Sequence, residues 1–262
     1  MVFLKKKRVK NTTTRRRLGT GSGLFPPLCR GCGERGDYLC DCCKKYILEH
    51  VGRKDLMEEF RTMFPEVNEV FEKVEFLGFR DEILGELVEE YKYRCRKGMA
   101  GALAEVVEAG YLDDDTLDST LGSPLILVPY PTSRKHMRER GFGHMEKLVR
   151  RVGRDYRGAV EVREMLIRAK DVTQVGASEE VRRRQAKEAI KIAPRYLDEE
   201  GKLKEEYRGQ TIVVVDDVWT TGASIFEAGR MLKRAGAEKL LALEITKNRA
   251  GRSPVIRRGK FN

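Results

Sequence analysis

One segment, residues 212–224, constrains the fold more than any other part of the chain: four apolar residues precede a polar stretch with two acids, two threonines, a glycine and a serine. The apolar run predicts a central strand over 211–215, because β-branched residues favour buried strands. A helix is predicted over 223–235 and a further strand over 239–245. This order of strand, helix and strand indicates an α/β fold, in which helices flank a parallel sheet.

The polar residues after the strand are suited to a sugar phosphate. Ligands bind at the carboxyl ends of strands in open α/β sheets, which is where we expect Asp216 and Asp217. Gly222 permits a tight turn, and the unpaired first amides of the next helix attract an anion. Two acids at the end of a buried strand are costly without a ligand, which argues against a merely capped helix. The predicted phosphate-binding residues are Thr220, Thr221, Gly222, Ala223 and Ser224.

The rest of the chain predicts mainly helices and one more buried strand. That strand covers 125–128, is ended by Pro129, and is expected to end beside the strand that contains Val213. Gly98 and Gly101 are expected to divide a helical stretch over 81–109 into two helices. The remaining predicted elements are helices over 54–64, 143–156 and 179–189, a strand over 164–168 and a loop over 170–178.

Five of the six cysteines lie within 28–46, and four of them form two Cys-x2-Cys pairs separated by seven residues. This spacing allows four thiolates to surround one tetrahedral Zn2+, which would supply the folding energy of so short a segment. Two disulfides or a redox pair are the alternatives, and the lack of a signal peptide argues against disulfides. Cys42 could replace one ligand of the second pair. The predicted ligands are Cys29, Cys32, Cys40 and Cys43.

The net charge of +11 is unevenly distributed: residues 1–27 carry +8, residues 249–262 carry +5, and the part between carries −2. Basic tails can hold nucleic acid phosphates, or they can be disordered segments that keep a protein soluble. No apolar run is long enough to cross a bilayer, and we expect a cytoplasmic protein. The predicted organisation is a disordered basic tail over 1–27, a zinc-binding module over 28–50, an α/β domain over 51–248 and a basic tail over 249–262.

The segment 213–224 closely resembles the phosphoribosyl pyrophosphate (PRPP) motif of type I phosphoribosyltransferases. With the four cysteines ahead of it, the chain resembles the ComF family, named for a role in bacterial DNA uptake. Residues 128–142, which read VPYP and then MRERGF, look like the family's VPVP…LRERGFNQ stretch, with Gly143 and His144 in place of Asn and Gln. Residues 168–185 are similar to its R…TxxQ…RxxN pattern, and 90–93 to its helical Lys-Tyr pair.

The resemblance implies a type I phosphoribosyltransferase fold with an N-terminal zinc ribbon-like module. It also implies transfer of phosphoribose to an unidentified acceptor with release of pyrophosphate, Mg2+ accompanying PRPP. Asp216 and Asp217 would be the catalytic pair that holds the ribose 2′- and 3′-hydroxyls. The alternative is a non-catalytic protein that senses PRPP or a nucleotide and binds nucleic acid or a protein partner, because one fold can serve several functions.

A pyrophosphate leaving group needs cations, and several arginines are suitably placed in the sequence, although each could instead be solvated. The stretch 169–181 would be a loop that closes over the reacting centre, or an ordinary surface loop. His136 and His144 are expected on the surface. The pyrophosphate candidates are Arg134, Arg138, Arg140, Arg168 and Arg182.

Overall fold

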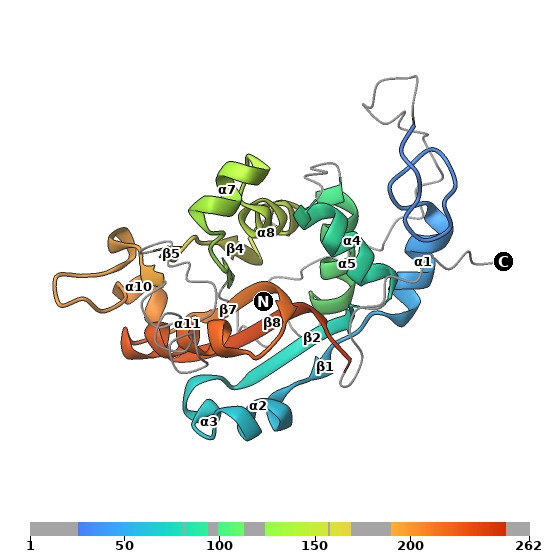
Figure 1. Ribbon diagram of the computed structural model, residues 1–262. Coiled ribbons are helices and arrows are strands. Elements are labelled where there is room, and N and C mark those ends of the chain that lie inside the picture. Colours follow the sequence, from blue (N-terminus) through green and yellow to red (C-terminus); the bar gives the residue numbers. More distant parts are fainter. Residues whose placement is uncertain are drawn as a thin grey trace, which may run out of the picture.

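The computed structural model describes residues 26–80, 82–93, 99–112, 124–156, 158–168 and 190–249, and its centre is a six-stranded sheet (Figure 1). The strand order is β1-β2-β8-β7-β3-β4, and every neighbouring pair is parallel except β1 with β2. The parallel sheet predicted from the sequence is therefore confirmed. The strands are β1 (Lys54–Asp55), β2 (Lys73–Phe79), β3 (Leu125–Pro129), β4 (Val160–Val162), β7 (Thr211–Trp219) and β8 (Lys239–Lys247).

Strand β7 lies between β8 and β3, where both of its faces are covered. Its first half, Ile212 to Val215, is fully buried, as expected for a run of β-branched residues in a parallel sheet. Val213 pairs with Leu241 of β8 and with Leu127 of β3. The predicted neighbour of the Val213 strand is thus confirmed, and the carboxyl ends of β3, β7 and β8 lie side by side.

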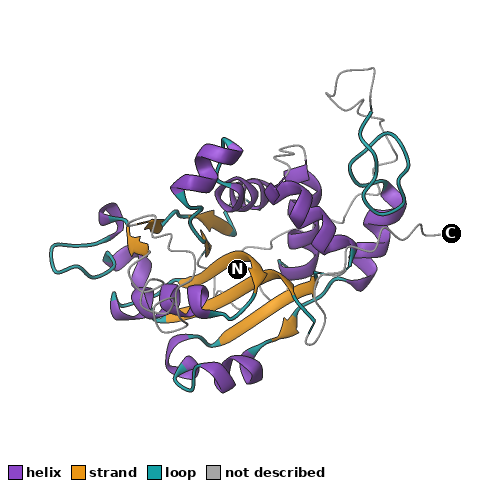
Figure 2. Cartoon of the chain, in the orientation of Figure 1, coloured by secondary structure: helices purple, strands orange, loops and turns teal. Residues whose placement is uncertain are grey.

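Helices cover both faces of this sheet (Figures 1 and 2). One core lies between the sheet and α1, α4, α5 and α8, and the other lies beneath α2, α3 and α11. The apolar residues of α8 recur at helical spacing, so that Met145, Leu148 and Val152 all face the first core. The helices are α1 (Asp41–His50), α2 (Met57–Met63), α3 (Val67–Val70), α4 (Ile83–Tyr93), α5 (Ala100–Tyr111), α7 (Arg134–Arg140), α8 (His144–Asp155), α10 (Glu205–Arg208) and α11 (Ala223–Arg234).

A separate two-stranded antiparallel sheet lies beside the second core. It pairs β5 (Leu166–Arg168) with β6 (Ile190–Ile192), and the 3-10 helix η2 (Pro194–Tyr196) follows. The predicted strand over 164–168 is therefore present, shorter than expected and outside the main sheet. Among the helices of the described residues, none is both long enough and apolar enough to cross a membrane.

Three sequence predictions are corrected by the structure. Strand β7 continues to Trp219, so that both acids lie within the strand and not after it. Gly101 lies in the first turn of α5 and does not end a helix, because the cost of one glycine in a helix is only about 1 kcal/mol. The helix predicted over 54–64 is shorter, since Lys54–Asp55 pairs with β2 as an edge strand.

Strand β2 was not predicted at all, although it lies next to β8 in the sheet. The predicted loop over 170–178 and helix over 179–189 lie outside the described residues, as do Gly98 and almost all of the two basic tails.

Candidate functional site

Asp217 lies in β7 and faces α4 and α8, where two basic side chains hold its carboxylate. The Lys92 ammonium of α4 lies 2.9 Å from Oδ1 and 2.7 Å from Oδ2. Nε2 of His144, the first residue of α8, lies 2.7 Å from Oδ2. Both carboxylate oxygens of Asp217 are thus already engaged, and the acid ties the central strand to two helices.

A second set of contacts continues from His144 to the loop after β3. Nδ1 of the imidazole lies 3.1 Å from Oγ1 of Thr132 and 3.2 Å from Nη1 of Arg140. Glu146 receives both the amide and the hydroxyl of Thr132, at 3.0 and 2.9 Å. The result is a continuous polar chain from Glu146 through Thr132 and His144 to Asp217, inside an otherwise apolar layer.

The contacts of Asp217 set its charge state and that of Lys92. Burial by itself would raise the pKa of Asp217, but the bond from His144 and the charge of Lys92 outweigh it and lower the pKa. Burial would likewise lower the pKa of Lys92, and the charge of Asp217 outweighs it and raises the pKa. Asp217 and Lys92 are therefore held as an ion pair.

Asp216 has a different environment, because consecutive residues of a strand point to opposite sides. Its Oδ1 accepts the backbone amide of Asp217 at 2.8 Å, and within the described part of the chain its Oδ2 accepts no hydrogen bond. Burial, followed by the charge of Asp217, raises the pKa of Asp216 to about 7. Asp216 is therefore the acid that has lone pairs available for a ligand.

Glu244 of β8 pairs with Asp216 across the sheet and is only 2% exposed. Its Oε2 has no hydrogen-bond partner among the described residues. Burial, followed by the charges of Asp216 and Asp217, raises the pKa of Glu244 well above its ordinary range. Burial of Glu244 thus favours its neutral form.

We expect Glu244→Gln to increase stability, and by more at pH 8 than at pH 5, because a carboxyl that the fold keeps neutral costs about 1.4 kcal/mol for each pH unit above its unfolded pKa. A folded-state pKa that is raised removes stability as the pH rises toward it, and the amide cannot ionise. Urea unfolding at both pH values measures the difference. A loss of stability at pH 8 would contradict the neutral assignment.

The predicted phosphate loop connects β7 to α11. Gly222 has φ of +68° and caps α11, whose first turn contains Ala223 and Ser224. The Ala223 amide lies 3.5 Å from the Thr221 hydroxyl, and the unpaired amides of the first turn face the end of β7. This local geometry is suited to bind an anion.

Trp219 fills the space beneath this loop. Its side chain is 1% exposed and packs edge-to-face on Phe60, at a centroid distance of 4.8 Å. Its Nε1 donates to Glu59 of α2 at 3.3 Å. The large residue at this position therefore supports the loop from below and does not form an exposed wall.

Gly222→Ala is expected to destabilise the protein by about 3 kcal/mol, because two penalties combine. A left-handed φ is strained for alanine, and a Cβ here would lie 2.4 Å from the Trp219 ring and 2.7 Å from Phe60. Gly236→Ala is the matched control, since its φ is +101° but a Cβ there meets nothing within 4 Å. Equal losses of unfolding free energy in the two variants would show that the loop is not tightly packed on Trp219.

A cavity of about 760 Å³ lies on the side of β3 and α8, and Thr132 and Glu146 line it, whereas the two acids and residues 220–224 do not. Arg134 and Arg168, two predicted pyrophosphate ligands, both line it. The Arg168 guanidinium lies 5.2 Å from the centre of the Tyr130 ring, and its Nε donates to the carbonyl of Pro131 at 3.0 Å. The cavity's cationic lining residues are Arg134, Lys147, Arg150, Arg154, Arg168 and Arg195.

The other predicted arginines lie elsewhere. Arg140 is buried against His144 and lies over the Tyr93 ring. It therefore belongs to the group of polar side chains around Asp217. Arg138 is exposed on α7 and does not line the cavity. Arg182 is outside the described residues. The structure thus separates the arginines that the sequence grouped together.

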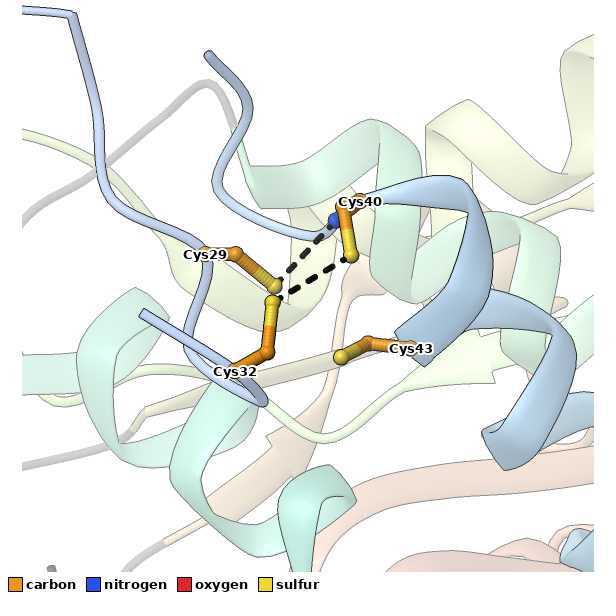
Figure 3. A group of neighbouring side chains, drawn as sticks. All are labelled: Cys29, Cys32, Cys40 and Cys43. Carbon is orange, nitrogen blue, oxygen red and sulfur yellow. Dashed lines mark hydrogen bonds between the residues drawn. The ribbon is translucent and has the colours of Figure 1, made fainter. Parts of the chain in front are cut away.

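The four predicted zinc ligands converge at one point (Figure 3). Their sulfur atoms all lie within 4.8 Å of one another, and those of Cys32 and Cys40 are 3.6 Å apart. Tetrahedral Zn2+ with four thiolates requires sulfur separations of about 3.8 Å, so the group fits this ion. Cys42 is exposed and is not part of the cluster, which settles the choice between it and its neighbours.

The cysteine cluster packs on the main body of the protein. Cys29 and Cys43 belong to the core that also contains Leu87 of α4. A Cβ on Gly31 would lie 2.3 Å from the Cys43 sulfur, so glycine is needed for the close approach. Burial tends to raise the pKa of Cys29, but backbone amides, first that of Cys40, lower it to about 7. Burial is also the first cause that raises the pKa values of Cys40 and Cys43, so without a metal the thiols of the cluster do not ionise together.

Sequence reasoning missed several residues that the structure brings to the site. His144 was expected on the surface but is buried and bonded to Asp217. Lys92 was noted only as part of a helical Lys-Tyr pair, and Thr132 and Glu146 carried no signal. Each lies far from the acids along the chain, 125 residues in the case of Lys92.

Comparison with known proteins adds two findings. Residues 146–257 match the phosphoribosyl transferase domain family, a range that includes β7, the phosphate loop and α11. The chain is also 22% identical over 215 residues to Competence protein F of Haemophilus influenzae, and the aligned part covers 82% of each protein. This second similarity is longer than the domain match and so extends beyond it.

Proposed function

We propose that this chain, a phosphoribosyltransferase-like protein of the ComF type, binds PRPP at the end of β7 and transfers its phosphoribosyl group to an acceptor with release of pyrophosphate. The observation that carries the proposal is the position of Asp216. Its Oδ2 accepts no hydrogen bond from the described residues, and Asp216 lies in the last half of the central strand, which leads at Trp219 into a loop and the N-terminus of α11. Acid and amides are the two groups that a ribose 5-phosphate needs.

In this proposal the amides of 221–224 bind the 5′-phosphate and Asp216 accepts hydrogen bonds from the ribose hydroxyls. Asp217, fixed by Lys92 and His144, lies beneath the same ring. Departure of pyrophosphate leaves positive charge on the ribose, and the two carboxylates stabilise it electrostatically. Mg2+ that arrives with PRPP supplies charge neutralisation at the leaving group.

The cavity beside β3 receives the pyrophosphate. Arg134 and Arg168 line it, and six cationic side chains there meet two acidic ones, Glu146 and Glu164. Arg150 pairs with Glu164, and the other five cations still outnumber the one remaining acid, Glu146. Such a concentration of positive charge, in a body that is close to neutral, is suited to a polyanion.

We further propose that the four cysteines bind one structural Zn2+ and that the protein is cytoplasmic, where thiols remain reduced. The cluster holds 26–40 against α4, the helix that also provides Lys92. Metal binding therefore supports the fold near the site and takes no part in the reaction.

Trp219 allows a direct test of the ligand, because it is the only tryptophan and packs under the phosphate loop. PRPP is titrated with and without Mg2+ while its fluorescence is recorded, with calorimetry in parallel and ribose 5-phosphate for comparison. We expect saturable binding that Mg2+ strengthens. No heat and no fluorescence change with PRPP would reject the proposal. Pyrophosphate release with a panel of bases, ammonia and small amines then tests for transfer.

A non-catalytic role is the second candidate, favoured by the similarity to Competence protein F over most of both chains. In that case PRPP binds without turnover, and the protein contacts nucleic acid or a protein partner during DNA uptake. Affinity for single-stranded DNA should then fall steeply with salt and change when PRPP is added. Salt-insensitive or absent binding would eliminate this candidate.

A further inference from the structure

His144 is one of only three histidines in the chain, and its environment differs from that of the other two. His50 is exposed and the side chain of His136 is 45% exposed, whereas His144 is 6% exposed and lies within the first core layer. Its backbone carbonyl accepts the hydroxyl of Tyr91 at 2.9 Å, which fixes the start of α8 against α4. Both ring nitrogens have polar partners, which is the arrangement of a histidine with a defined orientation.

The partners determine where the imidazole proton lies. The carboxylate of Asp217 can only accept, so the 2.7 Å contact of its Oδ2 with Nε2 places a proton on Nε2. Nδ1 has two different partners: Arg140 can only donate to it, at 3.2 Å, and the Thr132 hydroxyl, which gives its proton to Glu146, can only accept from it, at 3.1 Å. The donor at Nε2 therefore follows from Asp217, whichever of these two contacts Nδ1 makes.

His144, which donates to Asp217, therefore also contacts Thr132 on the opposite side of the site. Thr132 lines the basic cavity, and its two bonds to Glu146 fix the loop after β3 beside the His144 ring. His144 lies between this loop and the acid. One side chain thus links the proposed pyrophosphate cavity to the proposed ribose site.

We propose that His144 is a positioning residue for the phosphoribosyl site, which through its Nε2–H donor orients the Asp217 carboxylate and couples it to the loop at Thr132. The inference rests on the proposed function in taking Asp217 as part of the ribose site. His144 acts through Asp217 and touches no reacting atom. The essential property is a hydrogen-bond donor at Nε2, and a glutamine amide could provide the same donor.

Two substitutions separate this role from simple packing. His144→Gln keeps a donor of similar reach, whereas His144→Phe fills the space without one. We expect PRPP affinity, measured by calorimetry, to change less than about threefold in His144→Gln and to fall roughly 10- to 100-fold in His144→Phe, as for loss of a hydrogen bond to a charged group. His136→Gln is the matched control, because the His136 side chain is partly exposed on α7 and contacts Glu139, and the variant should bind as the wild type does.

A spectroscopic measurement tests the same point without PRPP. With only three histidines, 15N NMR of the full chain resolves each ring, and His144→Gln assigns the signal by its loss. We expect Nε2 of His144 to carry a proton. The Nδ1–H tautomer would overturn the inference even if His144→Phe failed to fold.

The outcomes distinguish the inference from the function on which it rests. If the wild type does not bind PRPP, the proposed function fails, and the NMR measurement alone tests whether His144 donates from Nε2 to Asp217. If the wild type binds PRPP and His144→Phe binds equally well, the function stands and the positioning role is wrong. Equal losses in folded His144→Gln and His144→Phe would also overturn it, because the donor would then not be the property that matters.

Discussion

The Asp216→Asn variant is expected to lose PRPP affinity about 100-fold while keeping its stability, whereas Asp217→Asn is expected to be less stable by about 3 kcal/mol. The two acids are adjacent in sequence but have different contacts in the structure. Among the described residues none donates to Oδ2 of Asp216, whereas Asp217 is committed to Lys92 and His144.

The stability difference follows from the charges that each substitution leaves behind. Without the Asp217 charge, the Lys92 ammonium remains in a largely buried position without its counter-charge. Without the Asp216 charge, two costs are removed: burial of the carboxylate and, after it, repulsion from Asp217, which together raise the pKa of Asp216 to about 7. Asp216→Asn is therefore expected to be neutral or slightly stabilising above pH 7.

The pH dependence has opposite signs for the two acids. The pKa of Asp217 is lowered by folding, so its contribution is present above the unfolded value near 4 and is lost in stronger acid. The pKa of Asp216 is raised to about 7, so stability is lost as the pH rises from about 4 to 7. In Asp216→Asn this loss should disappear.

Urea unfolding and PRPP calorimetry on both variants measure these effects. Equal stability losses would show that Asp217 is not the anchor of the site. Unchanged PRPP affinity in folded Asp216→Asn would show that the free carboxylate does not face the ligand.

Removal of the metal is expected to produce the second large effect. The purified chain should contain one Zn2+ per molecule, and Cys43→Ser should lose it, with a substantial fall in melting temperature. A structural Zn2+ in a small module supplies on the order of 10 kcal/mol of apparent binding free energy at pH 7. Cys43 is also part of the core with α4 and α5, so loss of the metal should loosen the body as well.

Cys42→Ser is the control, because Cys42 is exposed on α1 and lies outside the cluster. It should retain the metal and the wild-type melting temperature. Metal analysis with thermal unfolding measures both. Full zinc occupancy in Cys43→Ser, or its loss in Cys42→Ser, would require a different ligand set.

The sequence by itself determined the features that depend on neighbouring residues. A β-branched run followed by a glycine turn and a helix start specifies β7 and α11 locally, and the structure contains both. The two Cys-x2-Cys pairs specified their cluster for the same reason, since each pair forms within one short turn. The strand at 125–128 followed from its apolar run and the proline that ends it.

Only the tertiary structure decided that Asp216 and Asp217 have different contacts and therefore different proposed roles. That difference depends on how far β7 extends and on which side chains α4 and α8 place against it, from positions 125 and 73 residues away. The sequence also could not reveal that His144 is buried, or that burial of Glu244 favours its neutral form. Burial and charge state arise from segments that meet only after folding, because the energy of a charged group depends on everything packed around it.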